Sequence, residues 1–198
     1  IFPNHRKKET LQFIKKGLKD FSISRPKERT KGWGIPVPND PEQMIYVWFD
    51  ALTNYITALG VKDNNQLFQD FWSNNKNKIH IIGKDIFKFH AIYWPAMLLS
   101  ANLPLPDKIF IHGFLTSGGQ KMSKTLGNVI DPFTVIQQYG TDAVRYYLLR
   151  EIPALGDGDF SHSRMKEIYN TDLAKELGNL VSRITTLGEK DGINISAE

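Results

Sequence analysis

The sequence predicts an α/β fold whose parallel sheet is doubly wound and is followed by a helical region. Three apolar segments are typical of buried strands, at residues 44–49, 78–83 and 108–115. A helical pattern follows each of the first two segments, and strands that alternate with helices favour a parallel sheet. From about residue 131 the patterns are mainly helical, which predicts a separate helical region.

The first 60 residues lead from a basic helix to the first pair of strand and helix. Residues 9–21 carry apolar side chains at helical spacing, with lysines on the other face. Residues 22–43 are rich in proline, glycine and charge, which indicates a loop with a short strand at its start. The strand over 44–49 is followed by Asp50, a residue type that can cap the helix over 51–59.

The remaining elements follow from similar patterns. Residues 60–78 are polar and rich in asparagine, which indicates a short helix in a surface insertion. Residues 85–103 predict a helix that bends or ends near Pro95. Beyond the third strand we expect a turn region at 155–161 and helices over 131–140, 141–152 and 164–190.

Composition limits the class of protein. The chain has 198 residues, of which 41% are hydrophobic and 12% aromatic, so it is globular. It has no cysteine, which excludes disulfides and thiolate metal sites, and no apolar run approaches a membrane span. Residues 1–31 hold seven Lys and three Arg against three acidic residues. This basic arm suits a polyanion, although a solvated helix face is the slightly better explanation of the charges alone. We expect a cytoplasmic location.

Ligands of doubly wound sheets bind beyond the carboxyl ends of the strands. This rule selects residues 48–55, 83–94 and 114–128. Gly83 ends a strand, where the backbone turns or approaches a ligand closely. Asp85 follows it, and a carboxylate there could hold a ribose diol. From the residue alone, capping of its own helix is the more common use.

Aromatic residues gather in the first two of these places. Trp48 is expected at the end of a strand, and Ala51 and Tyr55 share a face of the next helix. This fits an apolar pocket with polar tips as well as it fits core packing. His90 lies in an apolar helical stripe, and a buried imidazole needs polar partners. A single histidine on such a face is nevertheless more often a core residue.

The segment "GGQKMSKTLGNV" (118–129) joins two glycines, two lysines and two hydroxyl residues in one loop. Mobile cations such as Lys121 and Lys124 can follow charge that develops on a phosphate, and glycines let the loop move. It is not a Walker loop, in which the lysine follows a glycine at a helix start. An ordinary solvated loop is the alternative, because loops of lysine, serine and glycine are common.

The whole string is more specific than its composition. "KMSKTLGNVIDP" (121–132) resembles the KMSKS signature of class I aminoacyl-tRNA synthetases, with Thr125 at the position where the family usually has serine. Further segments resemble the bacterial methionyl-tRNA synthetases over nearly the whole chain: "DFSISR" (20–25), "GWGIPVP" (32–38), "IYVWFDALTNYITALG" (45–60), "IIGKDIFKFHAIYWPAMLLSANLPLP" (81–106) and "DAVRYYLLRE" (142–151). So many motifs in the family's order make a chance match negligible.

The resemblance implies an enzyme that activates methionine with ATP and Mg²⁺ and transfers the methionyl group to the 3′ end of tRNA(Met). It implies a methionine pocket of Trp48, Ala51, Leu52, Tyr55, Ile86, His90 and Trp94. Leu52 stands at a position where the other subgroup of this family often has proline. ATP would contact Gly83, Asp85, Leu115, Lys121, Ser123 and Lys124, of which Lys121 and Lys124 are the catalytic residues. Asn179 and Arg183, adjacent on one helix surface, would read the anticodon.

The resemblance also implies a division of the chain. Residues 1–22 would end an inserted connective domain, and 23–116 would form the second half of a Rossmann-like catalytic domain. Residues 117–160 would hold the KMSKS loop and stem-contact helices, and 161–198 would begin a helical anticodon-binding domain. The family's His-Ile-Gly-His signature is absent from the sequence, so we expect a piece of a longer protein that is inactive alone. We expect no metal site here, since zinc would belong to the absent insertion.

Two alternatives remain at this point. A class I synthetase for Ile, Val or Leu would share the lysine motif, but it would not combine "VWFDALTNY" with "GKDIFKFHAIYWP". A non-catalytic tRNA-binding fragment would differ in whether its gene also encodes the His-Ile-Gly-His half. The oligomeric state does not follow from the sequence.

Overall fold

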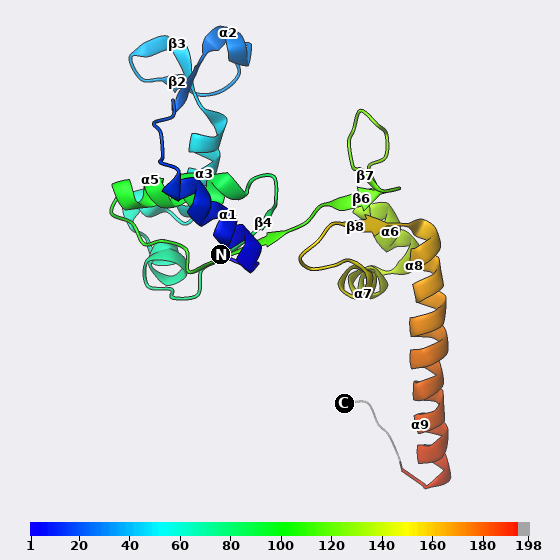
Figure 1. The fold of residues 1–198 in the computed structure, drawn as a ribbon. Helices are drawn as coiled ribbons and strands as arrows, with labels where there is room; N and C mark the ends of the chain where they lie inside the picture. Colours follow the sequence, from blue (N-terminus) through cyan, green and yellow to red (C-terminus); the bar gives the residue numbers. More distant parts are fainter. Residues whose placement is uncertain (194–198) are drawn as a thin grey trace. The chain divides into compact units, whose positions relative to one another are not determined.

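The chain forms two compact units, Ile1–His112 and Gly113–Glu198, in a computed structural model that describes residues 1–193. Figure 1 shows both units as ribbons, coloured along the sequence. The last five residues of the predicted 161–198 domain lie outside the described residues. The predicted division into four parts stays a prediction. No helix of the described part is both long and apolar enough to cross a membrane.

The first unit is built on a parallel pair of strands, β4 (Ile79–Gly83) and β5 (Lys108–His112). Their register runs from Ile79 opposite Lys108 to Gly83 opposite His112. Phe2 extends the pair, since its N–H donates to Ile109 O at 2.8 Å and its carbonyl accepts from Ile111 N at 2.9 Å. The parallel sheet of the sequence prediction is therefore present, and the α/β class is confirmed.

Helices cover the face of this pair that carries Ile82 and Ile111 and supply the core, whereas Ile79 and Ile81 on the other face are exposed. These helices are α1 (Asn4–Lys15), α3 (Val47–Thr57), η1 (Val61–Asp63), α4 (Gln66–Phe68), η2 (Gln69–Ser73), η3 (Phe89–Tyr93) and α5 (Trp94–Ser100). The residues over 60–78 are mostly exposed and form short helices, as their polarity predicted, but they are also anchored in the core. Phe68 and Trp72 are buried there, and the Trp72 indole donates to Pro104 O at 3.0 Å. The segment therefore packs on the core through two apolar side chains, although most of its residues are polar.

The segment over residues 24–45 forms a separate antiparallel sheet with the order β1–β3–β2. Its parts are β1 (Ser24–Pro26), α2 (Lys27–Thr30), β2 (Pro36–Val37) and β3 (Asp40–Ile45). Figure 1 shows this sheet at the end of α3 that carries its N-terminus. The predicted strand over 44–49 is therefore wrong in two respects. The strand ends at Ile45, and it belongs to this small sheet and not to the parallel pair.

The second unit combines a small mixed sheet with helices. Strand β6 (Leu115–Ser117) pairs antiparallel with β7 (Gln120–Lys121) and parallel with β8 (Gly158–Phe160). The predicted strand over 108–115 is thus two strands, β5 and β6, separated at Gly113 and Phe114. The predicted turn at 155–161 contains β8, which sequence reasoning missed because its three residues include glycine and aspartate, both rare in strands.

The helices of the second unit lie close to their predicted positions. They are α6 (Pro132–Tyr139), α7 (Thr141–Glu151), α8 (His162–Ile168), η4 (Tyr169–Leu177) and α9 (Gly178–Lys190). Asp131 caps α6, accepting hydrogen bonds from Phe133 N at 3.0 Å and Thr134 Oγ1 at 2.9 Å. Figure 1 shows the last three helices as one continuous rod.

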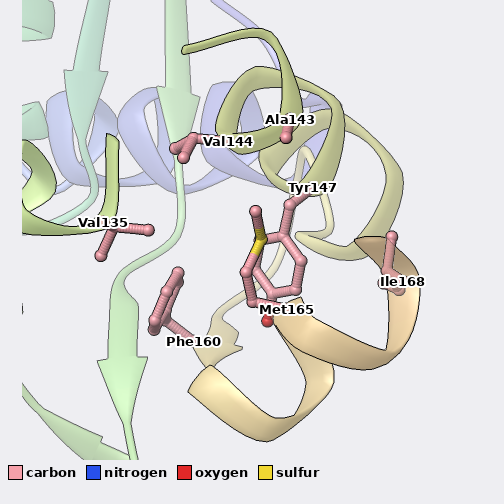
Figure 2. Close-up of a cluster of buried hydrophobic side chains, with 7 residues drawn as sticks. All are labelled: Val135, Ala143, Val144, Tyr147, Phe160, Met165 and Ile168. Atoms are coloured by element: carbon pink, nitrogen blue, oxygen red, sulfur yellow. The ribbon is translucent and has the colours of Figure 1, made fainter. Parts of the chain in front are cut away.

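One buried cluster holds α6, α7, α8 and β8 together. Figure 2 shows it around Tyr147, which is fully buried, with Val135, Ala143, Val144, Phe160, Met165 and Ile168. The Tyr147 ring lies edge-on to Phe160 at 5.2 Å between centroids. Its hydroxyl accepts a hydrogen bond from Ser161 N at 3.3 Å, so the buried oxygen has a partner.

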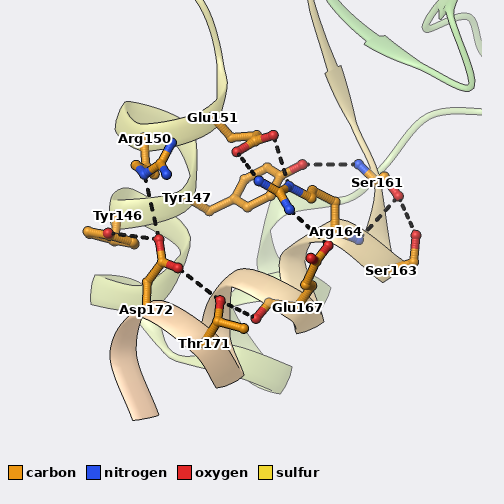
Figure 3. Close-up of polar contacts among 10 residues, drawn as sticks. All are labelled: Tyr146, Tyr147, Arg150, Glu151, Ser161, Ser163, Arg164, Glu167, Thr171 and Asp172. Atoms are coloured by element: carbon orange, nitrogen blue, oxygen red, sulfur yellow. Dashed lines mark hydrogen bonds and ion pairs between the residues drawn. The ribbon is translucent and has the colours of Figure 1, made fainter. Parts of the chain in front are cut away.

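Ion pairs beside this cluster orient the long rod (Figure 3). Arg164 of α8 donates twice to Glu151 of α7, at 2.9 and 3.2 Å, in a bidentate arrangement. Asp172 accepts from the Tyr146 hydroxyl at 3.1 Å and pairs with Arg150 at 3.6 Å. Two separate bridges therefore join α7 to the start of the rod that carries α9.

Candidate active site

Trp48 lies in the first turn of α3, where we had expected the end of a strand. Tyr46 precedes the helix in an extended conformation, and the N–H groups of Phe49 and Asp50 already donate to its carbonyl. Asp50 is therefore inside the first turn and does not cap the helix. A short apolar run reads equally well as a buried strand or as a helix start, which explains the error.

With Trp48 in α3, four of the predicted pocket residues lie in one aromatic cluster. Trp48 stacks on Phe89 with centroids 4.2 Å apart and lies edge-on to His90 at 6.3 Å. Tyr55 lies 6.1 Å from the ring of Trp94. Helix α3 supplies Trp48 and Tyr55, η3 supplies His90 and α5 supplies Trp94, and His80 of β4 lies against them. We use the name aromatic cluster for Trp48, Tyr55, His80, His90 and Trp94.

Hydrogen bonds fix the protonation of His90. Its Nδ1 lies 3.1 Å from the carbonyl oxygen of Ile86, which can only accept, so Nδ1 carries the proton. In the neutral ring Nε2 then accepts from the Tyr55 hydroxyl at 2.9 Å. Burial lowers the pKa of His90, although the bond to Ile86 partly offsets this, and burial raises the pKa of Tyr55. Both groups are therefore neutral near pH 7.

The other predicted pocket residues have different surroundings. Leu52 is buried in the core beneath the cluster, together with Trp94, Ile56 and Leu98. Ala51 is exposed on α3, one turn before Tyr55. Ile86 is half-buried and contributes its carbonyl to His90. The structure thus brings Trp48, Tyr55, His90 and Trp94 into contact, with Ile86 beside them and Leu52 below.

His80 completes the cluster and was missed in the sequence. It is the second residue of β4 and only 7% exposed. Its Nε2 accepts a hydrogen bond from the Trp94 indole at 3.2 Å, and its ring lies 4.3 Å from that of Tyr55. Burial and the nearby His90 lower the pKa of His80 to about 4. A histidine inside the apolar strand "KIHIIG" was the available signal.

The predicted ribose-binding residues follow β4 directly. Gly83 is the last residue of the strand, and Asp85 lies in the turn after it. A Cβ atom at Gly83 would lie 3.0 Å from Asp85 Oδ1, so the carboxylate already approaches the glycine backbone closely. A side chain at position 83 would displace the carboxylate, so the close approach of Asp85 explains why this position is a glycine.

The predicted phosphate loop belongs to the second unit. Gly118 and Gly119 form the turn of the β6–β7 hairpin with φ of 62° and 73°, a conformation that favours glycine. Lys121 Nζ lies 4.1 Å from the centroid of the Phe114 ring, and Lys124 is exposed in the following turn. Asn128 closes the loop, since its amide accepts from Ser123 N at 2.8 Å and donates to Lys121 O at 3.3 Å. The structure therefore groups Lys121, Ser123 and Lys124 in one closed loop.

A carboxylate of β8 anchors the start of this loop. Asp159 Oδ1 accepts from Thr116 Oγ1 at 2.7 Å and from Gly119 N at 2.8 Å, and these bonds lower the pKa of Asp159. Leu115, predicted near the adenine, is 39% exposed and contributes to a small apolar hollow beside Met122. No local pattern indicates Asp159, because its partners lie about 40 residues away.

Asn179 and Arg183 are exposed on α9, one turn apart. Their side chains are therefore accessible on the rod that the ion pairs of Figure 3 orient. No group of three or more His, Asp or Glu residues that could hold a metal ion occurs in the described part of the chain.

A family model described as tRNA synthetases class I (M) matches residues 2–185. The chain belongs to this family. A methionine–tRNA ligase of a Nostoc species is 53% identical over 194 residues, which are 96% of this chain and 36% of that relative. The ligase of Thermotoga maritima is 50% identical over 190 residues, covering 96% of this chain and 29% of the relative.

Solved structures of the family agree. The Mycobacterium tuberculosis methionyl-tRNA synthetase in complex with methionyl-adenylate matches with a TM-score of 0.83 and 47% identity over 95% of this chain and 36% of that one. The chain thus spans about a third of the length of these relatives. The synthetase family predicted from the sequence, and its methionyl branch, are confirmed.

Proposed function

We propose that this chain supplies part of a cytoplasmic methionine–tRNA ligase. The enzyme would activate methionine with MgATP and transfer the methionyl group to the 3′ end of tRNA(Met). The observation that carries the proposal is the aromatic cluster, in which Tyr55 and His90 are hydrogen-bonded at 2.9 Å beside the rings of Trp48 and Trp94. A thioether is apolar and polarisable, and aromatic rings offer it favourable contacts.

The first step joins methionine and ATP. A carboxylate oxygen of methionine would attack the α-phosphorus, the bond from that phosphorus to the oxygen that bridges to the β-phosphorus would break, and pyrophosphate would leave; Mg²⁺ would neutralise phosphate charge. The M. tuberculosis relative is named as bound to methionyl-adenylate, the product of this step, which supports ATP as the second substrate. The residues of this chain would act by positioning and by charge neutralisation.

Each part of the chain would then have its own task. Trp48, Ala51, Tyr55, His90 and Trp94 would surround the methionine side chain, with Ile86 and Leu52 supporting them. Gly83 and Asp85 would hold the ribose, and Leu115 would lie near the adenine. Lys121, Ser123 and Lys124 would bind the phosphates, where exposed lysine ammonium groups can follow the charge that moves to pyrophosphate. Asn179 and Arg183 would contact the anticodon.

The test is methionine-dependent exchange of labelled pyrophosphate into ATP by the full-length protein that carries this chain. Lys124→Ala should lower the exchange rate about 10²- to 10³-fold, as loss of one preorganised stabilising donor does. The methionine KM should barely change, because Lys124 is assigned to ATP. Lys175→Ala, which also removes an exposed lysine of the second unit, is the matched control. An exchange rate near that of the control would exclude Lys124 from the mechanism.

A non-catalytic tRNA-binding protein is the second candidate, favoured by the exposed pair of Asn179 and Arg183 on α9. The same assay separates the two. A folded full-length protein that binds tRNA but shows no methionine-dependent exchange would support the second candidate and refute the first.

A further inference from the structure

His80 has no task in the proposed reaction, yet it contacts two residues of the methionine wall. Its Nε2 lies 3.2 Å from Trp94 Nε1, and its ring lies 4.3 Å from the Tyr55 ring at 55°. Trp72 packs on it as well, with centroids 6.0 Å apart. Because β4 is paired along its length with β5, the position of His80 is set by the parallel sheet.

The hydrogen bond to Trp94 determines how His80 can act. An indole N–H is a donor only, so Nε2 of His80 must be the acceptor and the neutral ring carries its proton on Nδ1. Trp94 is 1% exposed, and a buried N–H without a partner carries a desolvation penalty. Without an acceptor on β4, the indole would have to rotate or remain unsatisfied. The bond to His80 therefore favours one orientation of the Trp94 ring.

The titratable groups that face His80 are Tyr55 from α3 and His90 from η3. The two imidazole centroids are 5.8 Å apart, and Tyr55 contacts both rings. Charge on either histidine would disfavour charge on the other. The neutral form of both rings is thus consistent with the hydrogen bonds that each makes.

We propose that His80 is a positioning residue of the methionine site, which orients the Trp94 indole by accepting its N–H and supports the Tyr55 ring by packing. The proposal rests on the proposed function, since it assigns the two oriented rings to the substrate side chain. His80 itself lies behind them and contacts no substrate. Loss of the acceptor should therefore weaken methionine binding and leave ATP binding unchanged.

Two substitutions distinguish the role of the Nε2 acceptor from the role of the imidazole ring. The amide oxygen of His80→Gln can reach the position of Nε2, whereas His80→Asn is shorter and places its amide near Nδ1. His80→Asn should raise the methionine KM about tenfold, with the ATP KM within twofold of wild type, and His80→Gln should restore the methionine KM to within about threefold. Thermal unfolding of both variants controls for general destabilisation.

The outcomes are distinct for the full-length protein. A methionine KM that is equal in wild type, His80→Asn and His80→Gln would overturn the proposal, as would parallel changes in the methionine KM, the ATP KM and the melting temperature. The indole N–H resonance of Trp94, assigned with Trp94→Phe, should move in His80→Asn and return in His80→Gln. That resonance requires no activity. A resonance that behaves as expected in a protein without methionine-dependent exchange would refute the proposed function and leave the orienting bond intact.

Discussion

Gly113→Ala should destabilise the second unit more than any ordinary loop substitution. Gly113 links β5 to β6 and passes the backbone of Gly156 closely. A Cβ atom at position 113 would lie 2.0 Å from the carbonyl oxygen of Gly156 and 2.3 Å from its carbonyl carbon. The two backbone segments would have to separate by more than 1 Å, since ordinary contacts begin near 3.4 Å. No flexible side chain is available to move instead.

The separation would strain two hydrogen bonds beside the contact. Phe114 N donates to Asp157 Oδ1 at 2.8 Å, and Gly158 N donates to Phe114 O at 3.0 Å. Overpacking alone typically costs 1–3 kcal/mol, and each strained bond adds about 1 kcal/mol. We therefore expect the free energy of unfolding to fall by about 3 kcal/mol.

Urea unfolding of the protein, followed by circular dichroism, measures this loss. Gly156→Ala is the matched control, because its Cβ would find only Pro153 Cβ at 3.7 Å, an ordinary contact. The control should lose less than about 1 kcal/mol. If the free energies of unfolding of the two variants agree within about 0.5 kcal/mol, the close approach of the two backbone segments does not exist in solution.

Three further predictions concern the proposed site. Trp48→Ala should raise the methionine KM much more than the ATP KM, whereas the exposed Trp33→Ala should change neither; equal changes for Trp48 would make it a core residue. Arg183→Ala should lower tRNA charging while methionine activation persists, with Lys190→Ala on the same helix as control. His80 should titrate near pH 4 by NMR, so about 3% is protonated at pH 5.5 against about 90% of an ordinary histidine. Since its folded pKa lies below the unfolded value, stability should fall as pH drops from about 6.5 towards 4, and a His80 midpoint near 6.5 would contradict the burial.

The loop over residues 118–129 and the strands β4 and β5 were predictable because their signals are local. Two apolar runs predicted the parallel pair, and two glycines before a lysine predicted a mobile loop, whose first residues form the turn of the β6–β7 hairpin. Asp131 is the first residue of the predicted helix over 131–140, and in the structure it caps α6. In each case neighbours in sequence are neighbours in space, so propensity and pattern suffice.

The errors have the opposite origin. Trp48 was placed at a strand end because the run over 44–49 contains no residue that marks the change from strand to helix. Strand β8 forms only because β6 pairs with it from about 40 residues away, and the same pairing brings Asp159 to Gly119. His80 could be suspected from its apolar strand, but its bond to Trp94 depends on how the helices fold over β4. Long-range contacts decided these positions.

The aromatic cluster has a further property that bears on the choice of substrate. The Tyr55 hydroxyl is committed to His90 and the Trp94 indole to His80, and within the described residues no buried side-chain nitrogen or oxygen lacks a partner. A side chain of similar length with its own acceptor, such as the amide oxygen of glutamine, would lose its water there, and neither the Tyr55 O–H nor the Trp94 N–H could donate to it without breaking its present bond. An unpaired polar group costs roughly 1–3 kcal/mol, which corresponds to about five- to 150-fold in affinity. A thioether carries no such penalty, so the commitment of the Tyr55 and Trp94 donors would favour methionine without any polar contact to its sulfur.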